Sequence, residues 1–299
     1  MPRRLLIYGA LLYVVLAWGL NMIISKQIID LISPLAFTSL RFVAMTPLAF
    51  LLVRLSGVRI HVERRDIPAL VLCGLCGYGA YQFFWIFGLK HTTPFASALL
   101  FSTAPIFTLM IVAIAGHEHV RPSRWAGAAV ALLGVAIFEG LFSGQLFFRL
   151  GDTLALSSAI IFAGYNVLGA RLLARYSALE LLAITMTVGA VIVCPAGIPA
   201  LLHTDFSALR WGFWWRFAYA ALFPIVLTYP VWNWGLREVG AGKGSVMQFL
   251  VPVLTGILSV PLINARFAPY ELIGAVVCLG GMTFAITLGG RGTRAATAS

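Results

Sequence analysis

The stretch "WIFGLK" at residues 85–90 returns as "WNWGLR" at residues 232–237, so Trp-x-x-Gly-Leu followed by a basic residue occurs twice. The two copies lie 147 residues apart, and the match continues downstream at that offset without a gap. The matched pairs that follow are Pro105 and Pro252, Thr108 and Thr255, Pro122 and Pro269, Gly127 and Gly274, and Gly134 and Gly281. So long a match predicts an internal repeat.

The repeat also extends upstream, where the offset becomes 145 residues. The matched pairs there are Gly19 and Gly164, Asn21 and Asn166, and Lys26 and Arg171. A loop insertion in the second half accounts for the shift. A tryptophan and a cation near a helix end also suit the membrane interface. Interfacial anchoring therefore explains each copy alone, whereas duplication explains the pair.

The composition places the chain in a lipid bilayer. Of its 299 residues, 61% are hydrophobic and 10% are charged, and the mean hydropathy is +0.95, whereas a soluble domain carries about 25% charged residues. We predict ten apolar helices, because each run can cross about 30 Å of hydrocarbon and backbone in lipid must be hydrogen-bonded within its own segment. The runs are 5–25, 35–55, 67–89, 94–115, 122–141, 151–172, 178–201, 211–236, 241–263 and 269–289.

Ten helices in two copies give five helices per copy, and five is an odd number. The second copy is therefore predicted to enter the membrane from the opposite side. We expect a first repeat over residues 1–146, a second, inverted repeat over residues 147–289, and a flexible tail over residues 290–299. Inverted repeats of this kind are typical of secondary transporters.

The net charge of +11 is an orientation signal rather than a sign of nucleic-acid binding. With the amino terminus in the cytoplasm, fourteen basic residues fall on the cytoplasmic side and six on the other. This positive-inside bias predicts that both termini are cytoplasmic.

Polar and aromatic side chains share helix faces in several runs, and these faces are predicted to line a substrate path, because polar groups facing lipid would be costly. The predicted substrate-binding residues are Trp18, Asn21, Tyr78, Tyr81, Gln82, Trp85, Ser97, Phe101, Tyr165, Asn166, Thr228, Tyr229, Trp232, Ser245 and Gln248. For each residue alone, hydrogen bonding between helices is the rival interpretation.

Three residues within the runs invite separate hypotheses. Pro105 and Pro252 each free a backbone carbonyl, so they are predicted to act as hinges or helix breaks, with a packed kink as the alternative. Arg41 carries a strong charge well inside the second run. It is interpreted as a snorkelling or hydrogen-bonded structural arginine, with a gate or a carboxylate anchor as the alternative.

The fifth and tenth runs instead carry small residues at i, i+4 and i+7. The stripes are Gly127, Ala131 and Gly134, and Gly274, Cys278 and Gly281. Small stripes let helix backbones approach closely, so these helices are assigned to a scaffold or to self-association between protomers.

Enzyme motifs are missing. The sequence has no H-E-x-x-H, no G-x-S-x-G and no complete phosphate loop. The spacing of Cys73 and Cys76 suits a metal, but no second pair completes it. We expect no enzyme activity, no metal and no cofactor.

The sequence resembles the drug/metabolite transporter superfamily, specifically its EamA-like family. The likeness rests on "AWGLN" at 17–21, "SPLAFTSLRF" at 33–42, and "GLK" and "GLR" followed by Pro105 and Pro252. Within the family it is most similar to YddG-type exporters of aromatic amino acids. The resemblance implies ten helices in two inverted halves, an inner-membrane location and a central cavity that exports small metabolites.

The predicted path is rich in aromatic residues and poor in charge, which suits a partly apolar zwitterion better than a polyanion. We therefore expect amino acids, including aromatic and other apolar ones, to be the cargo. An exporter of hydrophobic cations or drugs is the alternative, because aromatic cavities also attract cations. A channel or a membrane enzyme would belong to a different class of function.

Overall fold

A computed structural model describes residues 2–115, 121–141, 149–239 and 247–287. Its regular elements within these ranges are all helical, which confirms the predicted all-α class. The first half contains α1 (Pro2–Ile29), α2 (Pro34–Leu55), α3 (Ile67–Gly74), the π-helical segment η2 (Leu75–Gly79), α4 (Ala80–His91), α5 (Pro94–Phe101), α6 (Ala104–Ile114) and α7 (Pro122–Phe138). The second half contains α8 (Leu150–Leu172), α9 (Ala178–Leu202), α10 (Trp211–Ala221), the π-helical segment η4 (Leu222–Leu227), α11 (Thr228–Val239), α13 (Leu250–Ile263) and α14 (Pro269–Thr287).

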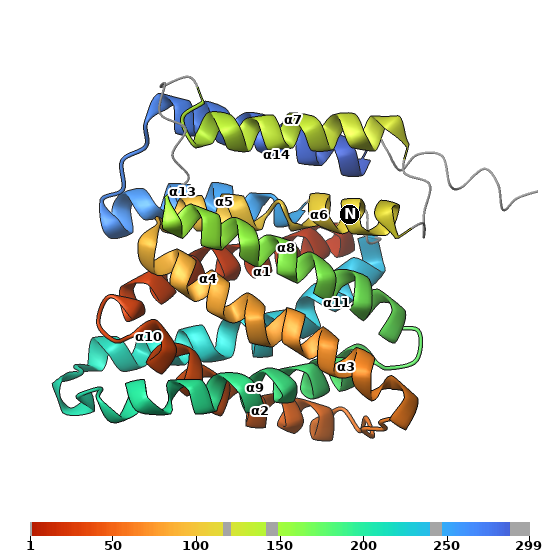
Figure 1. Ribbon diagram of the computed structural model, residues 1–299, viewed down its shortest axis with the longest axis vertical. Coiled ribbons are helices and arrows are strands. Elements are labelled where there is room, and N and C mark those ends of the chain that lie inside the picture. The colour runs from red at the N-terminus through yellow and green to blue at the C-terminus, as the bar shows by residue number, and fades with distance from the viewer. Residues whose placement is uncertain (1, 116–120, 142–148, 240–246, 288–299) are drawn as a thin grey trace, which may run out of the picture.

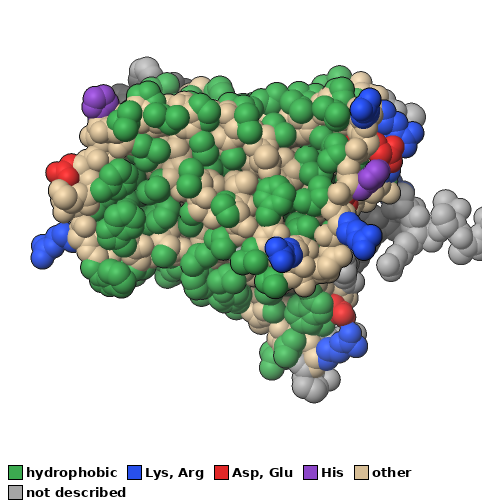
Figure 2. Space-filling model, turned by 90° about the horizontal axis from the view of Figure 1, so that it is seen from below, with side chains coloured by type: hydrophobic (Ala, Val, Ile, Leu, Met, Phe, Trp, Pro, Cys, Tyr) green, Lys and Arg blue, Asp and Glu red, His purple; other side chains and the backbone are tan. Residues whose placement is uncertain are grey.

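Several helices are long and apolar enough to cross a membrane. Among the residues that the structure describes, six helical spans meet this condition, one of them formed by α5 and α6 together, and α7, α13 and α14 are shorter apolar helices. Hydrophobic side chains cover the middle of the face shown in Figure 2, while most of its charged side chains gather at the two ends. This distribution fits a multi-pass membrane protein.

The helix starts follow from local capping. The Ser33 hydroxyl accepts a hydrogen bond from the Ala36 amide at 3.1 Å, and Thr93 does the same for Ala96 at 3.1 Å. Ser177 and Glu180 form a reciprocal capping box at the start of α9. Each cap satisfies amide groups that the first turn of a helix leaves unpaired, so the short connections between helices are tightly defined.

Two helix pairs lie at opposite edges of the molecule. In Figure 1, α7 and α14 run side by side at the top, and α2 and α9 lie together at the bottom. The helices between these edges include α1, α4, α8 and α11. The predicted site residues fall mainly on these middle helices, away from the α7–α14 pair.

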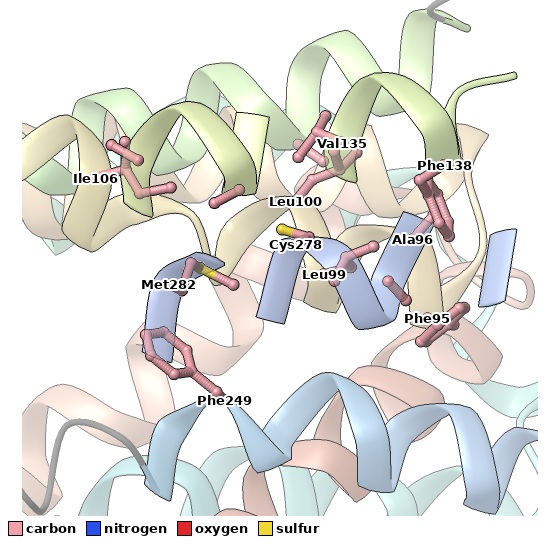
Figure 3. Close-up of a cluster of buried hydrophobic side chains, with 14 residues drawn as sticks. Phe95, Ala96, Leu99, Leu100, Ile106, Val135, Phe138, Phe249, Cys278 and Met282 are labelled. Atoms are coloured by element: carbon pink, nitrogen blue, oxygen red, sulfur yellow. The ribbon is translucent and has the colours of Figure 1, made fainter. Parts of the chain in front are cut away.

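Small residues allow α7 and α14 to pack closely. A Cβ atom built on Gly134 would overlap the backbone nitrogen of Cys278, and one on Gly281 would overlap that of Ala131. The predicted small-residue stripes therefore face each other within one chain. Side chains of α5, α6, α7 and α14 extend this contact into a buried core, where Phe95, Leu99, Val135 and Met282 meet (Figure 3).

The two π-helical segments occur at equivalent places in the sequence repeat. Leu75 begins η2 and Leu222 begins η4, and these two positions are related by the same offset that relates the two Trp-x-x-Gly-Leu motifs. π-Helical turns are uncommon and often lie at functional sites. Their recurrence links the sequence repeat to a local backbone feature.

Candidate functional site

An aromatic cluster joins the middle helices α4, α5 and α8, and Tyr81 on α4 lies at its centre. The Tyr81 ring centroid is 5.3 Å from that of Phe101, 5.1 Å from that of Phe162 and 6.4 Å from that of Trp85. Tyr165 extends the cluster, with centroids 5.2 Å from Phe162 and 5.9 Å from Tyr78. We call the set Tyr78, Tyr81, Trp85, Phe101, Phe162 and Tyr165 the aromatic cluster.

Gly77 in η2 makes room for this cluster. A Cβ atom on Gly77 would lie 2.7 and 2.8 Å from the Cε2 and Cγ atoms of Tyr165. Real Cβ contacts are not that short, so only glycine lets the Tyr165 ring lie against the π-helical backbone. The irregular segment thus positions an aromatic ring from the second half against the first.

Arg41 lies beside the cluster. Its guanidinium carbon is 5.6 Å from the Trp85 ring centroid and 5.8 Å from that of Phe37, both within cation–π range. Its Nε donates a 3.1 Å hydrogen bond to the carbonyl of Ala220. Pro224, four residues further along the chain, has no N–H with which to pair that carbonyl. Arg41 therefore donates a hydrogen bond to a carbonyl that the residue four positions later, a proline in η4, cannot pair.

A second group of predicted residues connects α1 to α11. The Trp18 indole donates to the Pro224 carbonyl at 2.9 Å and to the Thr228 hydroxyl at 3.0 Å. The Trp18 and Trp232 ring centroids lie 5.0 Å apart. This group, Trp18, Thr228 and Trp232, holds α1 against η4 and α11.

Two predicted asparagines make contacts within the protein. The Asn21 side-chain oxygen accepts a 3.3 Å hydrogen bond from Ser25 on the same helix. Asn166 donates to the Thr108 hydroxyl on α6 at 3.3 Å. Thr255 matches Thr108 in the sequence repeat. Its hydroxyl on α13 donates to the Gly19 carbonyl on α1 at 3.3 Å. Asn166 thus makes the contact between helices that the rival interpretation predicts, whereas Asn21 is paired within its own helix.

Three predicted side chains are buried with polar atoms that have no hydrogen-bond partner. Within the described part of the chain, they are the Gln82 Oε1, the Trp85 Nε1 and the Ser97 Oγ. Buried polar groups are normally paired. These atoms are therefore suitable contacts for a polar ligand.

The remaining predicted residues are only partly defined. Gln248 is half-buried just before α13. Tyr229 belongs to α11, but its side chain lies outside what the structure describes, and Ser245 lies outside the described residues altogether.

Helix breaks precede both predicted hinge prolines. α5 ends at Phe101 and α6 begins at Ala104, so the predicted single run 94–115 is two helices joined before Pro105. In the second half a turn at Phe249 precedes α13, which contains Pro252 in its first turn. At the break, the Ser102 hydroxyl donates to the Leu99 carbonyl and the Thr103 hydroxyl to the Leu100 carbonyl, both at 2.6 Å, and each carbonyl also accepts the backbone N–H of the same residue.

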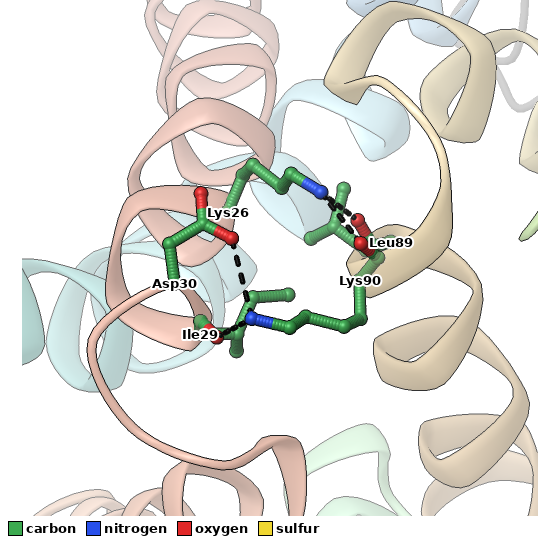
Figure 4. A network of polar contacts seen from close by, with 5 residues as sticks. All are labelled: Lys26, Ile29, Asp30, Leu89 and Lys90. Atoms are coloured by element: carbon green, nitrogen blue, oxygen red, sulfur yellow. Dashed lines mark hydrogen bonds and ion pairs between the residues drawn. The ribbon is translucent and has the colours of Figure 1, made fainter.

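Lysines cross-cap the ends of α1 and α4 (Figure 4). Lys26 of α1 donates to the carbonyls of Leu89 and Lys90 at 2.9 and 2.8 Å, and Lys90 of α4 donates to the Ile29 carbonyl at 2.6 Å. Lys90 also lies 3.4 Å from the Asp30 carboxylate. Helix carboxyl ends carry partial negative charge, so the two ammonium groups stabilise the close approach of these ends.

Phe162 was missed by the sequence reasoning, although it contacts three members of the cluster. Its signal was spacing, because it lies three residues before Tyr165 and therefore on the same face of α8. A phenylalanine in an apolar helix carries no polar atom to mark it. Its role depends on which face of the helix turns inward.

No group of metal-binding side chains occurs in the residues that the structure describes. The four cysteines are free thiols, two of them buried. Buried and half-buried free thiols of this kind pack as small apolar side chains.

The comparisons with known proteins identify the class. The sequence model of the EamA-like transporter family matches the chain twice, over residues 5–139 and 149–287. The chain therefore belongs to the EamA-like transporter family, within the drug/metabolite transporter superfamily. It is accordingly a transporter rather than an enzyme.

Its curated relatives include proteins named as exporters. An uncharacterized transporter, YyaM of Bacillus subtilis, is 27% identical over 94% of this chain and 93% of its own length. A probable terminal-alkyne amino-acid exporter of Streptantibioticus cattleyicolor is 26% identical over 76% and 75%. The aromatic amino acid exporter YddG of Ancylobacter novellus is 26% identical over 79% and 81%. One crystal structure shares the fold, with a TM-score of 0.67 at 20% identity over 94% of this chain and 98% of that one.

Proposed function

We propose that the protein exports amino acids, aromatic and other apolar ones included, by alternating access. In this proposal ten helices form two inverted repeats, 1–146 and 147–289, which rock around a site at the aromatic cluster. The relatives named as amino-acid exporters support the cargo class.

The observation that carries the proposal is the composition of the aromatic cluster. Tyr81 and Phe101 lie in the first match of the family model, and Phe162 and Tyr165 lie in the second. The rings therefore meet where the two halves meet. Movement of one half against the other would open this contact toward one side of the membrane at a time.

Several features support the repeat. The family model matches once in each half, and η2 and η4 occupy equivalent positions. The inversion itself follows from an odd number of helices per repeat. Cysteine labelling of the loop 56–63 and the loop 203–210 from either side of the membrane tests it, because the proposal places these loops on opposite sides.

The charge asymmetry supports an inner-membrane location with both termini in the cytoplasm. Self-association through α7 and α14 would have to use their outward faces, which carry Val130 and Val276, because their small residues face each other within the chain. Crosslinking between cysteines at these two positions, in membranes, tests that part of the proposal.

Export of hydrophobic cations is the second candidate, because aromatic rings attract cations. Arg41 favours the amino-acid proposal, since a fixed positive charge beside Trp85 repels a cationic substrate. No carboxylate was found at mid-membrane depth in the sequence. We therefore propose facilitated movement down the substrate gradient rather than proton-driven transport.

Counterflow in proteoliposomes tests the function. Vesicles loaded with unlabelled phenylalanine should accumulate labelled phenylalanine saturably, and an imposed proton gradient should leave the rate unchanged. Substitution of Tyr78, Tyr81 or Gln248 should impair exchange while the protein remains folded. Efflux of a hydrophobic cation without any amino-acid exchange would instead support the second candidate, and wild-type exchange by all three variants would move the path elsewhere.

A further inference from the structure

Arg41 has more hydrogen-bonding capacity than the protein uses. The side chain is 4% exposed, and its Nε is paired with Ala220. Within the described ranges, neither a hydrogen bond to its two Nη groups nor an ion pair to a carboxylate is present. A buried charge without a counter-ion is costly. The two Nη groups of Arg41 are therefore available to an anionic hydrogen-bond acceptor from outside the protein.

The surroundings of Arg41 hold its guanidinium in place. The Phe37 and Trp85 rings lie within 5.8 and 5.6 Å of its central carbon. The Nε hydrogen bond adds a third restraint on the group. A guanidinium fixed in this way is preorganised, so a ligand would not have to order it.

Two further unpaired atoms lie on the adjacent helix. Gln82 and Trp85 are three residues apart on α4, so they share a face. The Gln82 Oε1 needs a donor and the Trp85 Nε1 needs an acceptor, and both atoms are buried without one in the described part of the chain. The site as a whole therefore lacks an anionic acceptor at Arg41 and a donor at Gln82.

We propose that Arg41 binds the carboxylate of the transported substrate and thereby determines specificity for molecules that carry a free carboxylate. A carboxylate can accept two parallel hydrogen bonds from the guanidinium, and a substrate ammonium can donate to Gln82. The apolar side chain of the substrate would then contact the aromatic cluster, which begins at Trp85. This inference rests on the proposed function, because it assigns a role to Arg41 within the same site.

A purely structural Arg41 would behave differently. Its single bond to the Ala220 carbonyl involves Nε only, so loss of the arginine would weaken the α2–α10 contact and reduce transport of every substrate equally. A carboxylate-binding arginine would instead affect only substrates that carry the carboxylate. The ratio between two substrates therefore separates the two roles.

The test is competition against labelled phenylalanine in counterflow, using unlabelled phenylalanine and phenylalaninamide, whose carboxylate is blocked. We expect the wild-type protein to prefer phenylalanine roughly tenfold, or about 1.4 kcal/mol, and R41Q to reduce that preference to about twofold. R41K keeps the charge but loses the planar fork, and it should give an intermediate ratio. If R41Q does not fold, R41K carries the test.

Arg216 provides a matched control. It also stacks on a tryptophan, Trp215, at 5.4 Å, and it donates to the Gly212 carbonyl of its own helix at 3.2 Å. R216Q should keep the wild-type ratio. An unchanged ratio in R41Q or R41K, or a wild-type protein that does not distinguish phenylalanine from phenylalaninamide, would overturn the proposal.

A measurement without transport separates this inference from the proposed function. 3-Phenylpropionate, which has a carboxylate but no ammonium, should raise the Tm of the wild-type protein, raise that of R41K less, and leave that of R41Q unchanged. Stabilisation that depends on Arg41, together with no amino-acid exchange, would contradict the proposed function and support the arginine's role. Amino-acid exchange together with equal stabilisation of all three proteins would do the reverse.

Discussion

The α7–α14 pair and the middle helices pack through opposite kinds of residue, small ones in the pair and large aromatic ones in the middle. α7 and α14 are unbroken helices that meet through glycine, alanine and cysteine, with backbone against backbone. Between the two edges, by contrast, the chain is interrupted at η2, at η4 and before Pro105, and α4, α5 and α8 meet through large rings. Close backbone contact leaves little freedom for movement, whereas rings and irregular turns leave polar atoms unpaired. The contrast separates a rigid support from the region in which a ligand could bind.

The largest effect is expected from Gly134→Leu, which disrupts the contact between α7 and α14. The new side chain would start inside the backbone of α14 at Cys278, so the two helices would have to separate. We expect a loss of about 3 kcal/mol or more and little folded protein, measured by size-exclusion chromatography in detergent. Gly280→Leu is the control, because Gly280 on α14 has no atom within 4 Å of its Cβ position. Equal behaviour of the two variants would refute the close-packed support.

Tyr81→Ala tests the middle helices. It removes the central ring of the aromatic cluster, and one aromatic contact is worth about 1 kcal/mol. Amino-acid exchange should fall roughly five- to tenfold while the purified protein still elutes as a folded species. Tyr81→Phe keeps the ring and should retain most of the exchange. Full exchange by Tyr81→Ala would mean that the substrate does not contact this cluster.

The smallest effect is expected from Arg3→Ala. Arg3 on α1 pairs with Glu238 on α11 at 3.0 Å, but its side chain is 79% exposed. Exposed ion pairs contribute about 0–1 kcal/mol, so neither the Tm nor the exchange rate should change measurably. A large loss of exchange would show that the end of α1 has a part in transport beyond this ion pair.

The apolar runs predicted most helix boundaries well, because length and hydropathy alone decide what can cross a bilayer. The predicted run 178–201 is the helix Ala178–Leu202, and 151–172 is Leu150–Leu172. The run 94–115 became two helices. Pro105 signalled that break, but the place where the first helix ends depends on the local turn hydrogen bonds of Ser102 and Thr103.

The site was harder to predict because it depends on partners far apart in the chain. Arg41 was identified from the sequence as a charge inside an apolar run. Its hydrogen bond to the Ala220 carbonyl depends on a proline in another helix. Trp18 and Trp232 were both identified, whereas their contact was not. The π-helical turns gave no sequence signal, because the residues that form them are ordinary apolar ones. What the sequence supplied was the set of unusual residues rather than their pairing.

The cross-capping of α1 and α4 has a consequence for sequence variation. Three of the four acceptors that the two lysines use are peptide carbonyls, which every amino acid provides. A saturation mutagenesis scan should therefore find positions 26 and 90 selective for long cationic side chains, while positions 29 and 89 accept any apolar residue of suitable size. Substitutions at positions 29 and 89 would therefore preserve the hydrogen bonds between the ends of α1 and α4.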